Sequence, residues 1–179
     1  MNRNRDCPNI KPILDALRAG VGHSEFGLRV QGLFAHALLE IGGTITEVNQ
    51  QGHPDVKWVK DAKINIFQIK SIFHNYAGGT LLISPNDIAG ICPSTPDEVG
   101  YFAVLDCAFP ISWVISEYNA IRRHQHSLVS IESIRATANP NLSMEISRIF
   151  MELVTRHQEN LQLLSFRVLR DRALRCERL

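Results

Sequence analysis

The sequence has few cysteines, and their spacing does not suggest a metal site or a disulfide framework. The four cysteines, Cys7, Cys92, Cys107 and Cys176, lie far apart, and no CxxC pair occurs among them. Structural zinc sites and small disulfide-stapled domains depend on closely spaced cysteines. We therefore expect four reduced thiols, most of them buried.

Long hydrophobic runs are also lacking. No apolar run reaches the roughly 18 residues that a membrane-spanning helix needs. Residues 1–6 include charged side chains, but the apolar segment of a signal peptide does not follow them. The sequence therefore predicts no membrane span and a cytoplasmic location.

An excess of charge of either sign is missing as well. The 19 Lys and Arg residues nearly balance the 18 Asp and Glu residues, which leaves a net charge of +1. Such a balance argues against non-specific coating of nucleic acid. It does not exclude DNA binding, because a local basic surface is sufficient for that. The 45% hydrophobic composition is that of an ordinary globular protein. We expect residues 1–179 to form a single domain.

Hydrophobic periodicity predicts helices and strands in mixed order. The predicted elements are helices over 9–19 and 24–41 (the second capped by Ser24), strands over 44–48, 55–59, 64–71 and 80–83, a helix from Ser84, strands over 101–106 and 112–115, a helix over 118–123 capped by Ser116, and helix after residue 139, either as two helices or as one broken helix. This order predicts a mixed α/β layer architecture, with a core over 24–124 and a helical C-terminal extension over 125–179.

The strands over 55–59 and 64–71 form a predicted hairpin whose register follows from its turn. If the turn is centred between Asp61 and Ala62, Asp55 faces Gln68 on the neighbouring strand. Because side chains alternate along a strand, Gln68 and Lys70 share that face, while the intervening residues point into the core. An acid, an amide and an ammonium group are therefore expected on one face of the hairpin.

This combination suits Mg²⁺-dependent phosphodiester hydrolysis. Asp55 and a second oxygen would hold a hard divalent cation, which keeps several of its waters. Such an ion polarises the scissile phosphate and lowers the pKa of a bound water. Lys70 would orient that water or neutralise charge that develops on the phosphate.

The same residues carry a family resemblance. His53-Pro54-Asp55, followed after residues 56–67 by Gln68-Ile69-Lys70-Ser71, resembles the PD-(D/E)xK signature of restriction-endonuclease-like nucleases, in the QxK variant of Mrr-type proteins. The resemblance implies an αβββαβ core, DNA as the partner and Mg²⁺ or Mn²⁺ as the cofactor. It implies that Asp55 and Gln68 are metal ligands, and that Asp55, Gln68 and Lys70 are catalytic.

In that class the helix before the first strand often carries a glutamate, and here Gln31 stands at the matching position. We therefore predict supporting roles for Gln31 and His53. With amides at positions 31 and 68, the site is short of carboxylates, and one carboxylate attracts a divalent cation less than three do. Glu25 and Glu47 are possible replacements, whereas Glu40 lies on the opposite side of the helix from Gln31.

Four cations are candidate phosphate contacts, namely Arg29, Lys57, Arg122 and Arg123. A solvated helix end is the alternative interpretation of the Arg122–Arg123 pair. The apolar positions between residues 142 and 168 complete the core or form a homodimer seam. Two other functions stay open: a nuclease-fold DNA-binding or interaction module without catalysis, and an unrelated α/β domain with an accidental motif.

Overall fold

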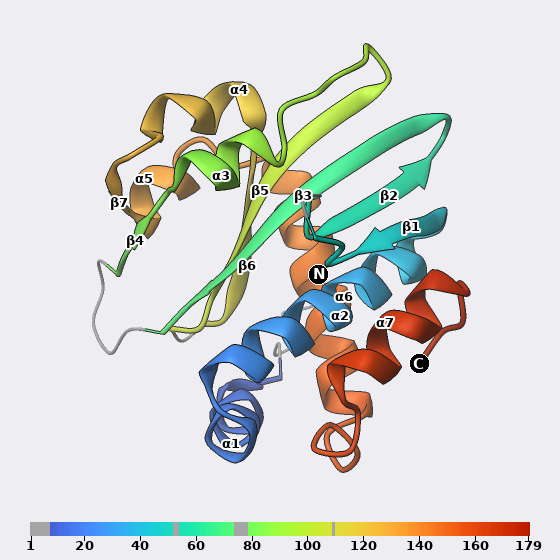
Figure 1. The fold of residues 1–179 in the computed structure, drawn as a ribbon. Helices are drawn as coiled ribbons and strands as arrows, with labels where there is room; N and C mark the ends of the chain where they lie inside the picture. The colour runs from blue at the N-terminus through green and yellow to red at the C-terminus, as the bar shows by residue number, and fades with distance from the viewer. Residues whose placement is uncertain (1–7, 52–53, 74–78, 109) are drawn as a thin grey trace, which may run out of the picture.

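The computed structural model describes residues 8–51, 54–73, 79–108 and 110–179. It is a mixed α/β structure built around a five-stranded sheet with the strand order β1-β2-β3-β5-β6 (Figure 1). The strands are β1 (Thr44–Val48), β2 (Val56–Lys60), β3 (Lys63–Ile72), β5 (Glu98–Asp106) and β6 (Ser112–Glu117). β3 and β5 are parallel, while β1–β2, β2–β3 and β5–β6 are antiparallel. The sheet is therefore mostly antiparallel.

The predicted register of the β2–β3 hairpin is confirmed. Val56 pairs with Phe67 and Lys60 pairs with Lys63, so one further step along the ladder places Asp55 opposite Gln68. The turn residues Asp61 and Ala62 have φ values of 50° and 61°. Left-handed backbone at both central residues is the mark of the tight hairpin turn whose twist matches that of its strands.

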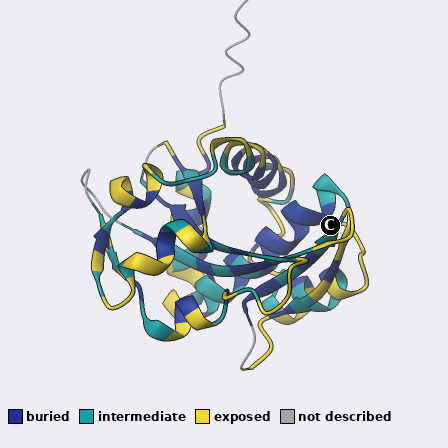
Figure 2. Ribbon diagram, turned by 90° about the horizontal axis from the view of Figure 1, so that it is seen from above, coloured by how far each residue is buried: buried dark blue, intermediate teal, exposed yellow. Residues whose placement is uncertain are grey.

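Four helices cover the first face of the sheet: α1 (Lys11–Val21), α2 (His23–Ile41), α6 (Pro140–Arg156) and α7 (Phe166–Leu174). Phe34 of α2 lies at the centre of this core, with its ring centroid 5.1 Å from that of Phe67 and 4.6 Å from that of Trp113. Figure 2 shows the buried residues gathered between the helices and the sheet. The C-terminal helices are thus part of the core.

Short elements cover the second face. They are α3 (Pro85–Ala89), α4 (Tyr118–Ile121), α5 (Ile131–Arg135), the 3₁₀ turn η1 (Arg122–His124), and a two-stranded ribbon of β4 (Thr80–Leu82) and β7 (Leu128–Ser130). They surround a separate apolar cluster to which the sheet contributes Ile66, Ile72, Phe102 and Val104. Alternation along β3 puts Phe67 and Ile69 in the first core, so Gln68 and Lys70 lie on the second face.

Strand β6 forms one edge of the sheet, and α6 covers it. The Trp113 and Ile115 amides donate to the hydroxyl oxygens of Ser147 and Ser143, at 2.8 and 3.0 Å. These two serines stand one helical turn apart on α6, which matches the alternate residues of the strand. The edge amides are therefore satisfied and unavailable for pairing with another chain.

Some predicted boundaries differ from the structure. Helix α2 begins at His23 with Gly22 as its N-cap, so Ser24 is not the cap. Ser116 belongs to β6, where its hydroxyl donates to the Ile134 carbonyl, and Glu117 precedes α4 instead. The segment 125–179, predicted to be a helical extension with helix after residue 139, also contains β7, and its last part forms the two separate helices α6 and α7. Within the described residues, no helix combines the length and apolarity needed to cross a bilayer.

Candidate functional site

Asp55 lies immediately before β2, where the β1–β2 connection closes through a 2.7 Å hydrogen bond from the Asn49 amide to the Asp55 carbonyl. Its side chain is 9% exposed. The carboxylate oxygen Oδ2 accepts hydrogen bonds from Gln68 Nε2 at 2.8 Å and from the Ile69 amide at 2.7 Å. The hairpin register thus brings Asp55 and Gln68 into direct contact.

Lys70 also lies in this group, but its partner is an acid that the sequence analysis did not assign to the site. The ammonium group is 2.8 Å from Oδ1 of Asp87. Asp87 is 5% exposed and stands in the first turn of α3. Its other oxygen accepts from the Ser84 amide at 2.9 Å, and its own amide donates to the Ser84 hydroxyl at 3.2 Å. This reciprocal cap fixes the Asp87 carboxylate over β3.

The helix-start pattern at Ser84-Pro85-Asn86-Asp87 was visible in the sequence and predicted the cap. Nothing local showed that α3 packs on the face that carries Gln68 and Lys70. Helix α3 closes against that face through Ile88, which belongs to the second apolar cluster. Asp55, Gln68, Lys70 and Asp87 are called the Asp55 cluster below.

The electrostatics of the Asp55 cluster are dominated by burial. The pKa of Asp55 is raised to about 6, chiefly by burial and in smaller part by the nearby Asp87 charge, while the Ile69 hydrogen bond and the Lys70 charge act in the opposite direction. The cluster thus holds two buried carboxylates and one ammonium group. A buried carboxylate with too little compensating positive charge is a group that a cation would stabilise.

Gln68 is oriented differently from the prediction that it lends an oxygen to a metal. Its Nε2 donates to Asp55, and its Oε1 points toward α3, where a Cβ at Gly90 would lie 3.2 Å from that oxygen. Only glycine at position 90 leaves this space fully open. If the Gln68 amide rotates by half a turn, its oxygen lies beside Asp55. A cation bound between the two oxygens would then replace the hydrogen bond from Nε2 to Asp55.

The donor set fits one mode of magnesium binding. Among the described residues, no group of three or more His, Cys, Asp and Glu side chains could hold a metal. Mg²⁺, however, usually keeps several waters and is held by one or two carboxylates together with substrate phosphates. Asp55 and Asp87 are two buried carboxylates, the number that this mode uses, whereas a closed protein cage would need more ligands.

Gln31, predicted from the sequence to have a supporting role, does not join the Asp55 cluster. Gln31 lies on α2, which covers the opposite face of the sheet from Gln68, and its Oε1 is buried without a hydrogen-bond partner among the described residues. His53 lies outside the described residues.

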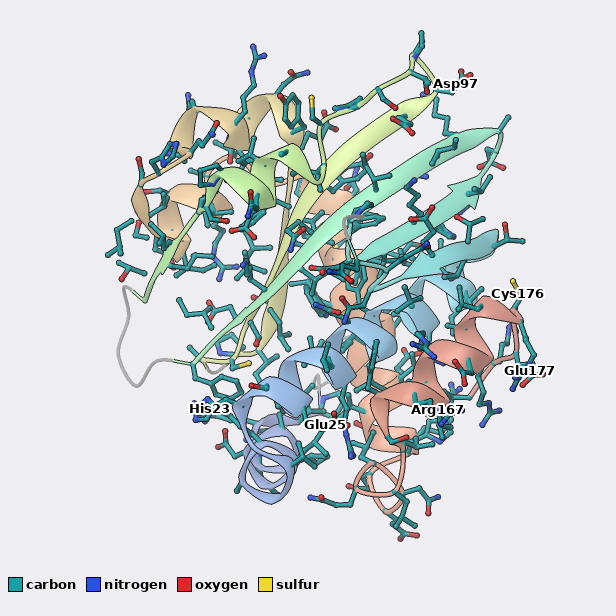
Figure 3. The ribbon with its side chains drawn as sticks, viewed as in Figure 1. His23, Glu25, Asp97, Arg167, Cys176 and Glu177 are labelled. Carbon is teal, nitrogen blue, oxygen red and sulfur yellow. The ribbon has the colours of Figure 1, made fainter. Side chains whose placement is uncertain are left out.

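The three glutamates considered as replacement acids are engaged elsewhere. Glu25, labelled in Figure 3, accepts from Arg29 and from the Phe166 amide. Glu40 pairs with two C-terminal arginines, at 3.7 and 3.8 Å, and Glu47 pairs with Lys57 at 3.1 Å. Asp87 is instead the second acid of the cluster.

Arg29, predicted to contact nucleic acid, has a structural position. It is 7% exposed, and its guanidinium donates to Glu25 at 2.8 Å and to the carbonyls of Leu161 and Gln162 at 2.9 and 3.1 Å. These bonds tie α2 to the segment before α7. A guanidinium buried in this way is poorly placed to contact a phosphate.

Arg29→Met is therefore expected to lower the free energy of unfolding by about 2–3 kcal/mol, since it leaves buried carbonyls unpaired while keeping the apolar stem. Urea unfolding measures the loss. The control Arg148→Met removes an exposed pair with Glu152 and should change stability by less than about 0.5 kcal/mol. Equal losses in the two variants would contradict the structural role of Arg29.

The other predicted cations remain at the surface. Lys57 on β2 is engaged with Glu47, and its side chain is 23% exposed. Arg122 and Arg123 are exposed on η1, and neither has a carboxylate partner within the described part of the chain.

Comparison with known proteins adds no assignment. No protein-family model matches the chain, and no curated protein matches its sequence. The functional proposal therefore depends on the geometry of the Asp55 cluster and on the fold that holds it.

Proposed function

We propose that the chain is a Mg²⁺- or Mn²⁺-dependent endonuclease that hydrolyses phosphodiester bonds in DNA. The observation that carries this proposal is the convergence of Asp55, Gln68 and Lys70 at one hairpin, joined by the buried Asp87. An acid pair, an amide and an ammonium group on one face form a donor set suited to a hard cation and a phosphate.

The strand topology supports a restriction-endonuclease-like core. Helix α2 is followed by the antiparallel strands β1, β2 and β3, and the chain then crosses over through β4 and α3 to β5, which is parallel to β3. This order, with β4 as an additional short strand, follows the αβββαβ pattern that the family resemblance implies. Asp55 precedes β2, and Gln68 and Lys70 lie on β3, which supports this interpretation of the motif.

Each residue of the cluster has a distinct role in the proposed reaction. Asp55 and Asp87 would hold the divalent ion, with the Gln68 oxygen completing the protein ligands. When bound, that ion supplies Lewis-acid polarisation of the phosphate and an acidified water. Lys70, held in place by Asp87, would orient the attacking water or neutralise charge on the phosphate in the transition state.

A non-catalytic module that binds DNA or protein through the same fold is the second candidate. The observation that favours it is that the polar groups of the cluster already have partners within the cluster. Gln68 donates a hydrogen bond to Asp55, and Lys70 is paired with Asp87. A site whose polar groups pair with one another can persist without metal or substrate.

Cleavage of supercoiled plasmid separates the two candidates. Wild-type chain with Mg²⁺ or Mn²⁺ should nick the plasmid, and Lys70→Ala should reduce the rate by about 10²–10³, the magnitude typical for loss of one transition-state charge contact. Lys63→Ala, at the exposed far end of the same strand, is the matched control and should cleave normally. Absence of metal-dependent nicking by folded wild type would favour the non-catalytic module.

We also propose a homodimer, because a twofold protein matches the symmetry of a duplex whose two strands are cut. Sedimentation at micromolar concentration tests this independently of cleavage, and a monomer in the presence of duplex DNA would contradict it.

A further inference from the structure

The β4–β7 ribbon presents an apolar pair to solvent. Leu82 and Leu128 are cross-strand partners and are 57% and 69% exposed. The alternate residues, Leu81 and Val129, face inward and pack on the second apolar cluster. The ribbon is therefore anchored through one face, while its other face carries an unburied leucine pair.

Two exposed arginines lie close to Leu128 along the chain, and neither forms an ion pair with a carboxylate among the residues that the structure describes. Arg122 and Arg123 occupy η1, in the chain segment that leads into β7, and both are exposed. Arg122 lies 5.9 Å from the Tyr118 ring centroid, and Arg123 donates to His124 at 3.3 Å. The sequence contains no Asp or Glu from position 118 to 131. By contrast, the exposed arginines Arg148 and Arg167 each have a carboxylate neighbour.

Backbone hydrogen bonds join this basic turn to the segment that leads into α3. The Ile83 amide donates to the Ser127 carbonyl at 3.1 Å, and the His126 amide donates to the Ile83 carbonyl at 2.9 Å. Ile83 precedes Ser84, the cap that holds Asp87 against Lys70. Asp87 is four residues after Ile83, and four residues span at most about 14 Å. The basic turn, which is hydrogen-bonded to Ile83, is therefore held close to the Asp55 cluster.

We propose that Leu82, Leu128, Arg122 and Arg123, here called the ribbon surface, bind the backbone of duplex DNA beside the Asp55 cluster. This inference rests on the proposed function, because it takes DNA as the ligand. The arginines contact phosphates, and the leucine pair packs against the sugars at the groove. Exposed guanidinium groups that have no carboxylate partner within the described ranges favour a polyanion, and minor-groove-binding proteins use apolar side chains of this kind against DNA.

Anisotropy of a labelled duplex, measured on the full chain in EDTA, tests the arginines without any hydrolysis. Arg122→Gln/Arg123→Gln should weaken binding about tenfold near 0.1 M salt, and should reduce the slope of log K against log salt by about 1.8, or 0.9 per lost phosphate contact. The control Arg148→Gln/Arg167→Gln removes two exposed arginines from α6 and α7, on the other side of the sheet; Figure 3 labels Arg167 there. It should leave both quantities nearly unchanged.

Leu82→Ser/Leu128→Ser should lower the affinity severalfold with an unchanged salt slope, because no phosphate contact is removed. Equal effects in the two arginine pairs, or no duplex binding by wild type at low salt, would overturn the proposal. An unchanged DNA affinity in the leucine variant, together with altered sedimentation, would assign the surface to a protein partner instead. Plasmid cleavage is measured separately. If the chain binds DNA through the ribbon surface but never cleaves it, the proposed endonuclease activity is contradicted and the proposed binding surface is not.

Discussion

Asp55→Asn is expected to raise the free energy of unfolding at pH 7.5 by about 2–3 kcal/mol, and at the same time to abolish metal-dependent cleavage. Burial raises the pKa of Asp55 from 3.8 to about 6 in the folded protein. Between these two values the folded state binds more protons than the unfolded state, so this carboxyl group lowers stability as pH rises through that window. Asparagine removes the charge and still offers an acceptor to the Ile69 amide.

Urea unfolding of both proteins from pH 4 to pH 8 measures the effect, which should grow between about pH 4 and pH 6 and then level off. The pH dependence of wild-type stability does not by itself reveal the contribution of Asp55, because burial lowers the pKa of His36 to about 4. His36 makes stability rise with pH over nearly the same window, and this opposes Asp55. Asp97→Asn, at the exposed site labelled in Figure 3, is the control and should show no such pH dependence. An Asp55→Asn protein less stable than wild type at pH 7.5 would contradict this account of the buried charge.

Asp87→Asn is expected to reduce cleavage by about 10–100-fold, because Lys70 loses the partner that holds it and the divalent ion loses one of its two proposed carboxylate ligands. The asparagine side chain can still accept from the Ser84 amide, so the cap of α3 is retained and the protein should stay folded. Single-turnover cleavage with Mg²⁺, together with circular dichroism, measures the two effects separately. Asn86→Ala, at the exposed neighbouring position, is the control.

A double-mutant cycle tests whether Asp87 and Lys70 act as a unit. Lys70→Met alone leaves the 5% exposed Asp87 carboxylate unpaired and should cost about 1–2 kcal/mol of stability, reduced by the partial exposure of the lysine. Adding Asp87→Asn should restore most of that stability loss, and it should reduce cleavage by a smaller factor than it does in wild type, because one of the two proposed roles of Asp87 is to hold Lys70. Additive effects in both measurements would show that the two residues act independently.

The predictable part of the candidate site is the part that local geometry determines. A tight turn at Asp61–Ala62 and the two-residue period of β strands were enough to place Asp55 opposite Gln68. Asp87 was missed because its meeting with Lys70 depends on how α3 packs over β3, and a capping motif describes only its own helix. The available signal was an acid in the first turn of α3, the first helix after β3.

The burial of Arg29 was not predicted, because charged side chains are usually exposed and its hydrogen-bond partners are the carbonyls of Leu161 and Gln162, far along the chain. Sequence periodicity likewise predicted apolar C-terminal helices without showing which face they cover. Ile146 and Phe150 of α6 and Leu169 of α7 complete the first core, so these helices belong to the same packed unit as the sheet. Contacts between distant segments explain both differences.

The central claim is that the Asp55 cluster binds a divalent cation with only two carboxylates. Titration of Mn²⁺, followed by electron paramagnetic resonance at pH 7.5 where Asp55 is ionised, tests it directly on wild type, Asp55→Asn and the Asp97→Asn control. The account predicts one saturable Mn²⁺ site per chain in wild type and in the control, and loss of that site in Asp55→Asn. Equal Mn²⁺ binding by wild type and Asp55→Asn, or none by wild type even with duplex DNA present, would contradict it.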